Sequence, residues 1–336
     1  MSPSAQRWDD PNLGAMVYPM TSTTLERLAE DYRALRDAAA VVDLGTWTAL
    51  EIVGSETRAF LQGTGTQDFE LLKTPGTAAR TLFLNEKGRP VAHAWVAFAP
   101  APENAGSKGA HPDTAWILSD PGAATSLGPH LDRLRIMEDV EFRGPDQMPT
   151  LLGVAGPERD PLAHAIASKI AGSALVRAEP LSFVLLPAEV DSAQIPPAVD
   201  PRAFEAWRIR VGIPYQGIDF DVDRIATELS LPEAISMTKG CYVGQEVVAR
   251  TANRGKVRRE RIGFRFTWNG EPIPRGTKLR TGGLECGHVT STAWEPGSSD
   301  GLGMGYLAPD SMELKLDILA IQGEKTTRLS LHSWPL

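Results

Sequence analysis

Residues 239–246, KGCYVGQE, stand where the sequence pattern of this 336-residue chain changes. Two glycines enclose Cys-Tyr-Val, and glycine accepts tight or left-handed backbone. Residues 245–250 then place apolar and polar side chains at helical spacing. We therefore predict a sharp turn that holds Cys241 just ahead of a helix, with Lys239 two residues away. Both features stabilise a thiolate, so Cys241 is a candidate nucleophile; the alternative is a small apolar side chain buried in the turn.

Downstream of this stretch, short apolar runs are separated by Gly and Pro. The runs lie at 262–266, 287–290, 302–307, 314–321 and 327–331. No helical period persists through them, which favours a small antiparallel β-barrel. Cys286 falls in one of the expected hairpins and is interpreted as structural.

Upstream, strand and helix patterns are mixed. Strands are expected at 48–53, 81–84, 91–98, 116–118, 151–154 and 181–186, and helices at 25–39, 55–61, 123–134, 162–170 and 203–211. Thr23 or Thr24 is expected to cap the first helix and Ser55 the second. Because the regular βαβ rhythm of a parallel sheet is absent, we expect an α+β fold. The predicted parts are an N-terminal arm (1–20), an α+β region (21–255) and a C-terminal β-barrel (256–336).

The composition excludes several classes of protein. The chain is 42% hydrophobic and carries a net charge of −8, which argues against strong nucleic-acid binding. No window approaches 18 uninterrupted apolar residues, and the first twenty residues lack the apolar core of a secretory signal. Two cysteines and six scattered histidines form neither a disulfide framework nor a zinc ligand set. We therefore expect a cytoplasmic protein with no membrane partner and no metal.

A further acidic stretch, Asp219, Asp221 and Asp223, begins like a calcium-binding loop. However, Arg224 occupies the position of the required glycine, and Ser230 that of the final glutamate. We interpret the three aspartates as solvated acids.

The octapeptide at 239–246 resembles the signature of YgfZ-type folate-binding proteins, a branch of the glycine-cleavage T-protein superfamily. Further blocks resemble that family in the same order: VDL at 42–44, FLQGTGTQD at 60–68, TLFLNEKGR at 81–89, AWRIRVGIP at 206–214 and Pro232-Glu233. The resemblance covers roughly residues 35 to 310.

The resemblance implies a three-part ring around a central hole that receives tetrahydrofolate or a one-carbon derivative. A pseudo-symmetric α+β region would supply two parts and the barrel the third. Arg208 is expected beside the pterin or its carboxylate tail, because a guanidinium binds planar and acidic groups through paired hydrogen bonds; the alternative is a surface ion pair. The residues expected to bind folate are Gln62, Thr66, Asp68, Phe83, Asn85, Arg208, Tyr242, Gln245 and Glu246.

The chain also departs from the aminomethyl-transferring members of that superfamily. They carry an acid pair after the hairpin glycine, where this chain has Ala92 and His93. General acid–base help is typically worth about 10²–10⁴-fold, so its loss weakens transfer chemistry. His93 could titrate near neutral pH, although a core-facing histidine is commoner. Gln67 and Arg210 also replace an asparagine and a glutamate of the family pattern.

By resemblance, we expect a tetrahydrofolate-binding accessory protein that supports assembly or repair of iron–sulfur enzymes, including tRNA-modifying ones. Its chemistry would rest on a Cys241 thiolate, backed by Lys239, that meets the one-carbon unit or a partner thiol. The alternatives are a folate-dependent aminomethyltransferase or demethylase, and a non-catalytic scaffold. Whether the protein is an enzyme stays open at this point.

A basic strip follows the octapeptide. It comprises Arg250, Arg254, Lys256, Arg258, Arg259 and Arg261, relieved only by Glu260. The simplest interpretation is a solvated strand that enters the barrel. The alternatives are contact with the polyglutamate tail of folate, with RNA or with a protein partner.

Overall fold

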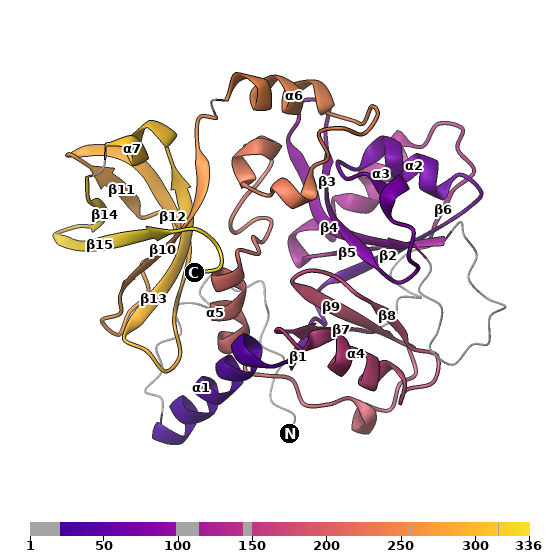
Figure 1. Cartoon of the computed structure of the whole chain (residues 1–336), viewed down its shortest axis with the longest axis horizontal. Helices are drawn as coiled ribbons and strands as arrows, with labels where there is room; N and C mark the ends of the chain where they lie inside the picture. Colours follow the sequence, from indigo (N-terminus) through magenta and orange to yellow (C-terminus); the bar gives the residue numbers. More distant parts are fainter. Residues whose placement is uncertain (1–20, 99–113, 144–149, 256, 315) are drawn as a thin grey trace.

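The computed structural model describes residues 21–98, 114–143, 150–255, 257–314 and 316–336. The expected arm at 1–20 lies outside these residues. Two α+β parts occupy one side of the molecule and a β-barrel the other (Figure 1). Within the described ranges, no helix has the length and apolar character needed to span a bilayer.

The first α+β part is built on a five-stranded antiparallel sheet with the order β3-β4-β5-β2-β6. The helices α2 (Thr57–Thr64) and α3 (Leu127–Leu134) accompany it, and Phe60, Phe83 and Leu131 share its core. This confirms the expected hairpin, which is β3 and β4. The strands are β2 (Thr48–Val53), β3 (Ala78–Leu84), β4 (Pro90–Phe98), β5 (Thr114–Ser119) and β6 (Glu141–Arg143).

The second α+β part has a four-stranded antiparallel sheet with the order β1-β7-β9-β8. The helix α4 (Arg159–Ala167) buries Ala163 and Ile166 against one face of this sheet. The strands are β1 (Ala40–Asp43), β7 (Thr150–Ala155), β8 (Ala174–Val176) and β9 (Leu181–Leu186).

Two long helices, α1 (Ser22–Asp37) and α5 (Pro201–Val211), pack together below the middle of the molecule in Figure 1. Pro201 suits the first turn of α5, where its missing N–H would have no helical partner. Gly212 ends α5 at φ +77°, and a Cβ there would meet the Trp334 indole at 2.7 Å. One core joins both sheets, α5 and the barrel, with Trp95, Phe183, Phe204 and Met304 among its members.

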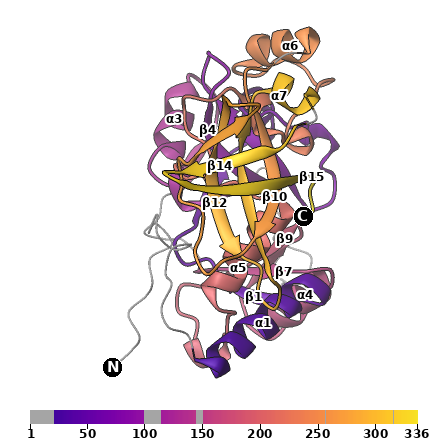
Figure 2. The same ribbon diagram turned by 90° about the vertical axis from the view of Figure 1, so that its left-hand side faces the viewer.

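The C-terminal part is a closed six-stranded antiparallel barrel, as expected from the glycine-separated runs (Figure 2). Its strand order is β10-β13-β12-β11-β14-β15, and β15 pairs back onto β10. The strands are β10 (Glu260–Thr267), β11 (Lys278–Thr281), β12 (Leu284–Trp294), β13 (Asp300–Leu307), β14 (Ile318–Gln322) and β15 (Lys325–His332). A short helix, α7 (Pro309–Glu313), precedes β14 and was not expected from the sequence.

Several helix starts differ from the sequence-based expectation. Thr21, rather than Thr23 or Thr24, caps α1, and its side chain accepts from the Thr24 amide. Ser55 does not cap α2; its hydroxyl donates to Asp139 Oδ2 at 2.6 Å. The helix expected at 123–134 is divided into a 3₁₀ turn, η3 (Pro121–Ala123), and α3. Side-chain acceptors set two of these starts: Thr21 caps α1, and Asp120 caps η3 by accepting from the Gly122 amide.

Candidate functional site

The octapeptide lies in the connection between α5 and the barrel strand β10, and Lys239 anchors it to the first α+β part. The Lys239 ammonium donates hydrogen bonds to the carbonyl oxygens of Gln62, Gly65 and Gln67, at 2.7, 2.7 and 2.8 Å. An ammonium has three N–H donors, so all of them are used. Burial lowers the pKa of Lys239 to about 8, and Asp68 nearby opposes that shift. Lys239 therefore holds the loop after α2 in place, and its expected role as a catalytic partner of the thiol stays a prediction.

Backbone contacts reinforce this anchor. The Thr66 hydroxyl donates to the Ala234 carbonyl at 2.6 Å, and the Ser236 amide donates back to the Thr66 carbonyl at 2.9 Å. The Val243 amide donates to the Gly63 carbonyl at 3.2 Å. The structure thus brings together the loop after α2 and the octapeptide, which are far apart in the sequence.

Gly244 begins α6 (Gln245–Arg254) in a left-handed conformation, at φ +83°. A Cβ at this position would lie 2.6 Å from the Asn85 carbonyl oxygen in the β3–β4 turn. Glycine is therefore required here both by conformation and by the close approach of two backbones. The β3–β4 turn therefore packs against the start of α6, which lies at the top of Figure 1.

Replacing Gly244 with alanine is expected to lower the free energy of unfolding by about 2–3 kcal/mol, because strain and a backbone clash add. Urea denaturation followed by circular dichroism measures this change. Gly240→Ala is the matched control, since Gly240 has no positive φ and a Cβ there meets nothing within 4 Å. Equal effects at the two glycines would contradict the role given to Gly244.

Cys241 is exposed, so the interpretation of it as a buried core residue is wrong. It lies four residues before the first residue of α6, with the turn at 242–244 between them. Its neighbour Tyr242 is buried, and the Lys239 ammonium lies 5.1 Å from the Tyr242 ring centre. Cys286 in β12 is 2% exposed, which agrees with a structural role. Of the two thiols, Cys241 alone faces solvent.

Three of the residues expected to bind folate are buried and already engaged. Phe83 packs in the core of the first sheet, and Tyr242 packs beside β3 and α6. Thr66 is fully buried and bonded to Ala234. Their side chains are parts of the scaffold, and their expected contact with folate stays a prediction.

The other expected residues in this region are partly or fully exposed. Asn85 closes the hairpin turn by accepting from the Lys87 and Arg89 amides. Gln62 donates to Asp68, which in turn caps a 3₁₀ turn, η2 (Phe69–Leu71). Gln245 and Glu246 lie in the first turn of α6, and Glu246 pairs with Arg250. The contacts of these side chains neither support nor contradict their expected role in binding folate, which stays a prediction.

Arg208 is not a surface ion pair, and its hydrogen-bond donors are already engaged within the protein. It is 1% exposed, and its five N–H donors bind Glu205, Asp219, the Ile213 carbonyl and Ser291. The buried Asp219 also accepts from the hydroxyls of Thr290 and Ser291. Arg208 therefore fastens α5 to the barrel strand β12. Asp219 is correspondingly not the solvated acid expected from the sequence.

A second group of polar residues, which sequence analysis did not single out as a site, lies between the parts. In β3 and β4, Arg80 and His93 are buried and hydrogen-bonded to each other, with the Trp95 ring beside them. Trp95 in turn contacts Trp47, which contacts Tyr215 after α5. Several buried atoms here have no partner among the described residues: Arg80 Nη2, His93 Nδ1, Asp120 Oδ2, Tyr215 Oη, Gln216 Oε1 and Tyr306 Oη. We call these six residues the central polar cluster.

The central polar cluster could not be predicted from sequence spacing alone, since its members come from five different strands or loops. Buried polar atoms are normally satisfied by protein, water or ligand. Burial of the Asp120 carboxyl group disfavours its charged form and raises its pKa to about 7.

Comparison with solved structures identifies the fold. The glycine cleavage system aminomethyltransferase T from Bartonella henselae superposes with a TM-score of 0.74 at 17% identity, covering 92% of this chain and 89% of that one. The chain has an aminomethyltransferase-like fold. No protein-family model matches it.

Curated proteins with similar sequences point in two directions. A mitochondrial iron–sulfur cluster assembly factor, the IBA57 homolog of Neosartorya fischeri, is 27% identical over 263 residues, which are 68% of this chain and 57% of that protein. A chloroplastic protein of Arabidopsis thaliana whose name describes a transferase is 23% identical over 304 residues (82% and 66%). The aminomethyltransferase of Halothermothrix orenii is 29% identical over 127 residues (38% and 34%). The chain thus spans 66% or less of the length of each of these relatives.

Within this aminomethyltransferase-like fold, the basic strip is not one continuous surface. Arg261 is 2% exposed, and its guanidinium lies 4.1 Å from the Trp334 ring centre. Its Nε donates to the Leu229 carbonyl at 2.6 Å. Arg250 and Arg258 are exposed, whereas Lys256 lies outside the described residues. Arg261 is removed from the strip, and contact of the remainder with polyglutamate or RNA stays a prediction.

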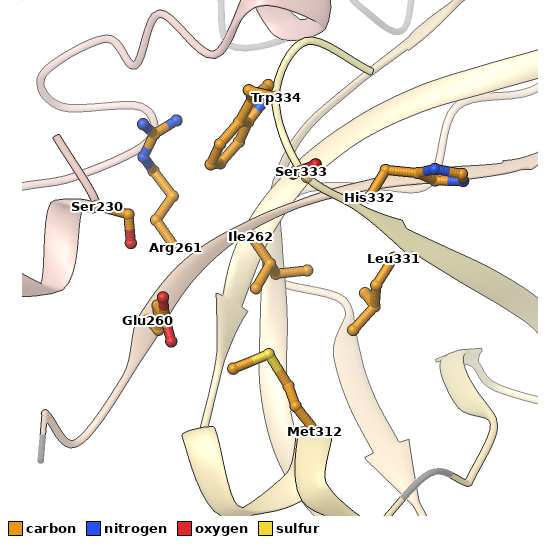
Figure 3. Close-up of a pocket in the computed structure, with 10 residues that line it drawn as sticks. Ser230, Glu260, Arg261, Ile262, Met312, Leu331, His332, Ser333 and Trp334 are labelled. Atoms are coloured by element: carbon orange, nitrogen blue, oxygen red, sulfur yellow. The ribbon is translucent and has the colours of Figure 1, made fainter. Parts of the chain in front are cut away.

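A pocket of about 410 Å³ opens on the side of the C-terminal β-barrel (Figure 3). Ile262, Met312 and Leu331 give it apolar walls, and Trp334 lies at its edge near Arg261. None of the residues expected to bind folate lines it. Across the parts of the chain that the structure covers, no three His, Cys, Asp or Glu side chains gather into a possible metal site.

Proposed function

We propose that this protein is a cytosolic, tetrahydrofolate-binding accessory protein of the YgfZ type that supports assembly or repair of iron–sulfur enzymes, tRNA-modifying enzymes among them. The observation that carries the proposal is an exposed thiol, Cys241, on a segment that the buried Lys239 fixes to the loop after α2. The names of the fungal relatives support the iron–sulfur role, and the aminomethyltransferase-like fold supports folate.

The residues present fit a reduced folate at the middle of the molecule. A pterin carries ring nitrogens and a carbonyl, and the folate tail carries carboxylates, so such a ligand offers both donors and acceptors. The central polar cluster contains unpartnered groups of both kinds, among them the donor Arg80 Nη2 and the acceptor Gln216 Oε1. When bound, tetrahydrofolate supplies a carrier for a one-carbon unit. The chain's own residues bind and orient it.

Cys241 supplies the reactive group that partners can reach. Its exposure allows a client protein or a partner thiol to approach, while Lys239 keeps the surrounding backbone in one conformation. Two cysteines, one of them buried, are too few for the usual four-thiolate iron–sulfur site. The iron–sulfur cluster therefore belongs to the client enzyme in this proposal.

Replacing Cys241 with serine is expected to lower the recovered activity of iron–sulfur enzymes by about tenfold or more in a strain that lacks the gene, because a hydroxyl is a far weaker nucleophile than a thiolate at neutral pH. The measurement is complementation by the full chain, with protein levels compared by immunoblot. Cys286→Ala is the control for loss of a sulfur as such. Full recovery by the serine variant would defeat the thiol role.

The alternative, an aminomethyltransferase or demethylase, has one observation in its favour, the fold shared with the Bartonella henselae transferase. His93 stands against it. Burial, together with the nearby Arg80 and Arg261 cations, holds the pKa of His93 well below its usual value, so the ring is neutral and does not replace a carboxylate. Rapid formation of methylene-tetrahydrofolate from an aminomethyl donor would favour the alternative, and anaerobic calorimetry with tetrahydrofolate tests ligand binding itself.

A further inference from the structure

The barrel strand β10 is paired along its whole length on one side and along only part of it on the other. It pairs with β13 throughout Glu260–Thr267, whereas β15 covers only residues 263–265. Successive residues of an antiparallel strand direct their N–H and C=O groups alternately to the two neighbouring strands. At least one residue of 260–262 therefore directs both groups to the side that β15 has left. No backbone hydrogen bond from another described residue reaches it there.

The end of the chain explains why β15 stops short. Beyond β15 the chain packs against α5: Trp334 Nε1 donates to the Ile209 carbonyl at 3.0 Å, and the Leu336 amide donates to the Arg210 carbonyl at 2.8 Å. Pro335, between them, has no N–H with which to continue a ladder. These contacts hold the tail on α5, so β10 and the continuation of β15 separate like the arms of a fork.

The pocket of about 410 Å³ lies in this fork (Figure 3). Residues 260–263 of β10 line it together with residues 331–334. Figure 3 shows the side chains of Ile262, Leu331 and Met312 directed toward one another, and all three belong to the barrel core or pack against it. The pocket therefore joins an unpaired strand edge to an apolar socket, formed by these three side chains.

Glu260 adds a negative charge beside the socket. Alternate residues of a strand point to the same face, so its carboxylate lies on the face of β10 that carries Ile262. No ion pair or hydrogen bond joins the Glu260 side chain to another described residue. In an added strand, the residues opposite Ile262 and Glu260 would also be two positions apart and share one face. A cation opposite Glu260 and an apolar side chain opposite Ile262 match this edge.

We propose that the fork between β10 and β15 docks an extended peptide segment of a partner protein, which adds a short strand to the free edge at 260–262. The segment places one apolar side chain in the socket and a lysine or arginine, two residues along, beside Glu260. In strand addition of this kind, main-chain hydrogen bonds supply affinity and pockets for alternate side chains supply specificity. Neither Cys241 nor the central polar cluster lines this pocket, so the inference goes beyond the proposed function and is tested without folate.

Selection from a random heptapeptide display library on the full chain tests this inference. The wild-type protein is expected to enrich sequences in which an apolar residue and a lysine or arginine stand two positions apart, with no proline between them. Met312→Trp fills the socket and should lower the recovery of these peptides about tenfold or more, because the apolar side chain can no longer be buried. Ser333→Phe, at an exposed position of the same pocket, is a second blocking variant.

Leu314→Trp is the matched control, since Leu314 is exposed and lies outside the pocket. It should recover the peptides as the wild type does, and circular dichroism compares the folding of all variants. The absence of enrichment by the wild type, or equal recovery by the wild type and a folded blocking variant, overturns the inference.

Synthetic versions of an enriched peptide test how it binds, with fluorescence anisotropy as the measurement. N-methylation of each peptide amide in turn removes one N–H donor. Strand addition predicts that alternate positions weaken binding about 2- to 12-fold, while the positions between them leave it unchanged. Glu260→Gln should weaken a lysine-containing peptide about 2- to 5-fold but leave its alanine counterpart unaffected. A uniform N-methylation profile would show a side-chain socket without strand addition and would overturn the inference.

Discussion

Replacing Arg208 with methionine is expected to lower the free energy of unfolding by about 3–5 kcal/mol, because it leaves a buried carboxylate without its counter-ion. Asp219 is fully buried and 2.8 Å from the Arg208 guanidinium. Methionine has similar length but offers no donors, so Glu205, Ser291 and the Ile213 carbonyl also lose a partner. Guanidinium chloride denaturation followed by tryptophan fluorescence measures the loss.

Arg36→Met is the control for this prediction, since Arg36 pairs with Asp37 on the surface, where an ion pair is worth about 0–1 kcal/mol. A loss below about 1 kcal/mol in Arg208→Met would contradict the structural role.

The pH dependence gives a second readout of the same contact. Burial alone raises the pKa of Asp219, but Arg208 and the hydrogen bonds from Ser291, Tyr215 and Thr290 outweigh it and bring the pKa below its ordinary value. That stabilisation is present above the unfolded pKa of about 4 and disappears as the pH falls through the lower folded value. In Arg208→Met this acid-side dependence should shrink.

Replacing Lys239 with methionine is expected to lower the free energy of unfolding by about 3–5 kcal/mol, because three hydrogen bonds from a charged donor are lost together. The carbonyl oxygens of Gln62, Gly65 and Gln67 would be left without that donor. Hydrogen–deuterium exchange locates the effect: the amides of Thr66 and Gln67, which donate to the Thr81 hydroxyl, should exchange faster. Because the octapeptide rests on this loop, recovery of iron–sulfur enzyme activity should fall as well.

Lys278→Met is the matched control, since Lys278 forms an exposed pair with Glu285. If Lys239 acted on the thiol instead of the loop, its replacement would lower activity while stability and amide exchange stayed at wild-type values.

The sequence predicted the secondary structure better than the site. Strands were found because apolar runs end at Gly and Pro, which holds for β2, for the β3–β4 hairpin and for the barrel. Gly244 could be anticipated beside Cys241, since a left-handed turn was the expected use of glycine there. These features depend on neighbours in the sequence, so local pattern is sufficient to reveal them.

The side-chain roles depend on partners that are distant in the sequence. Lys239 binds carbonyl oxygens 172 to 177 residues away, and Arg208 binds Ser291 in the barrel 83 residues on. A lysine beside a cysteine and an arginine in a helix each allow a chemical role and a structural one. The choice depends on how many N–H donors of the side chain are already hydrogen-bonded within the protein. That number is known only from the three-dimensional structure.

The core shared by both sheets, α5 and the barrel has a consequence for how such a molecule can change over time. Trp95, Phe183 and Met304 pack in one cluster although they belong to three different parts. A substitution at Met304 changes the packing of the core residues in the other two parts as well. Compensating substitutions are therefore needed in all three parts together. An unrelated barrel could replace this one only if its surface packed equally well against the shared core. We therefore expect related proteins to inherit the three parts together.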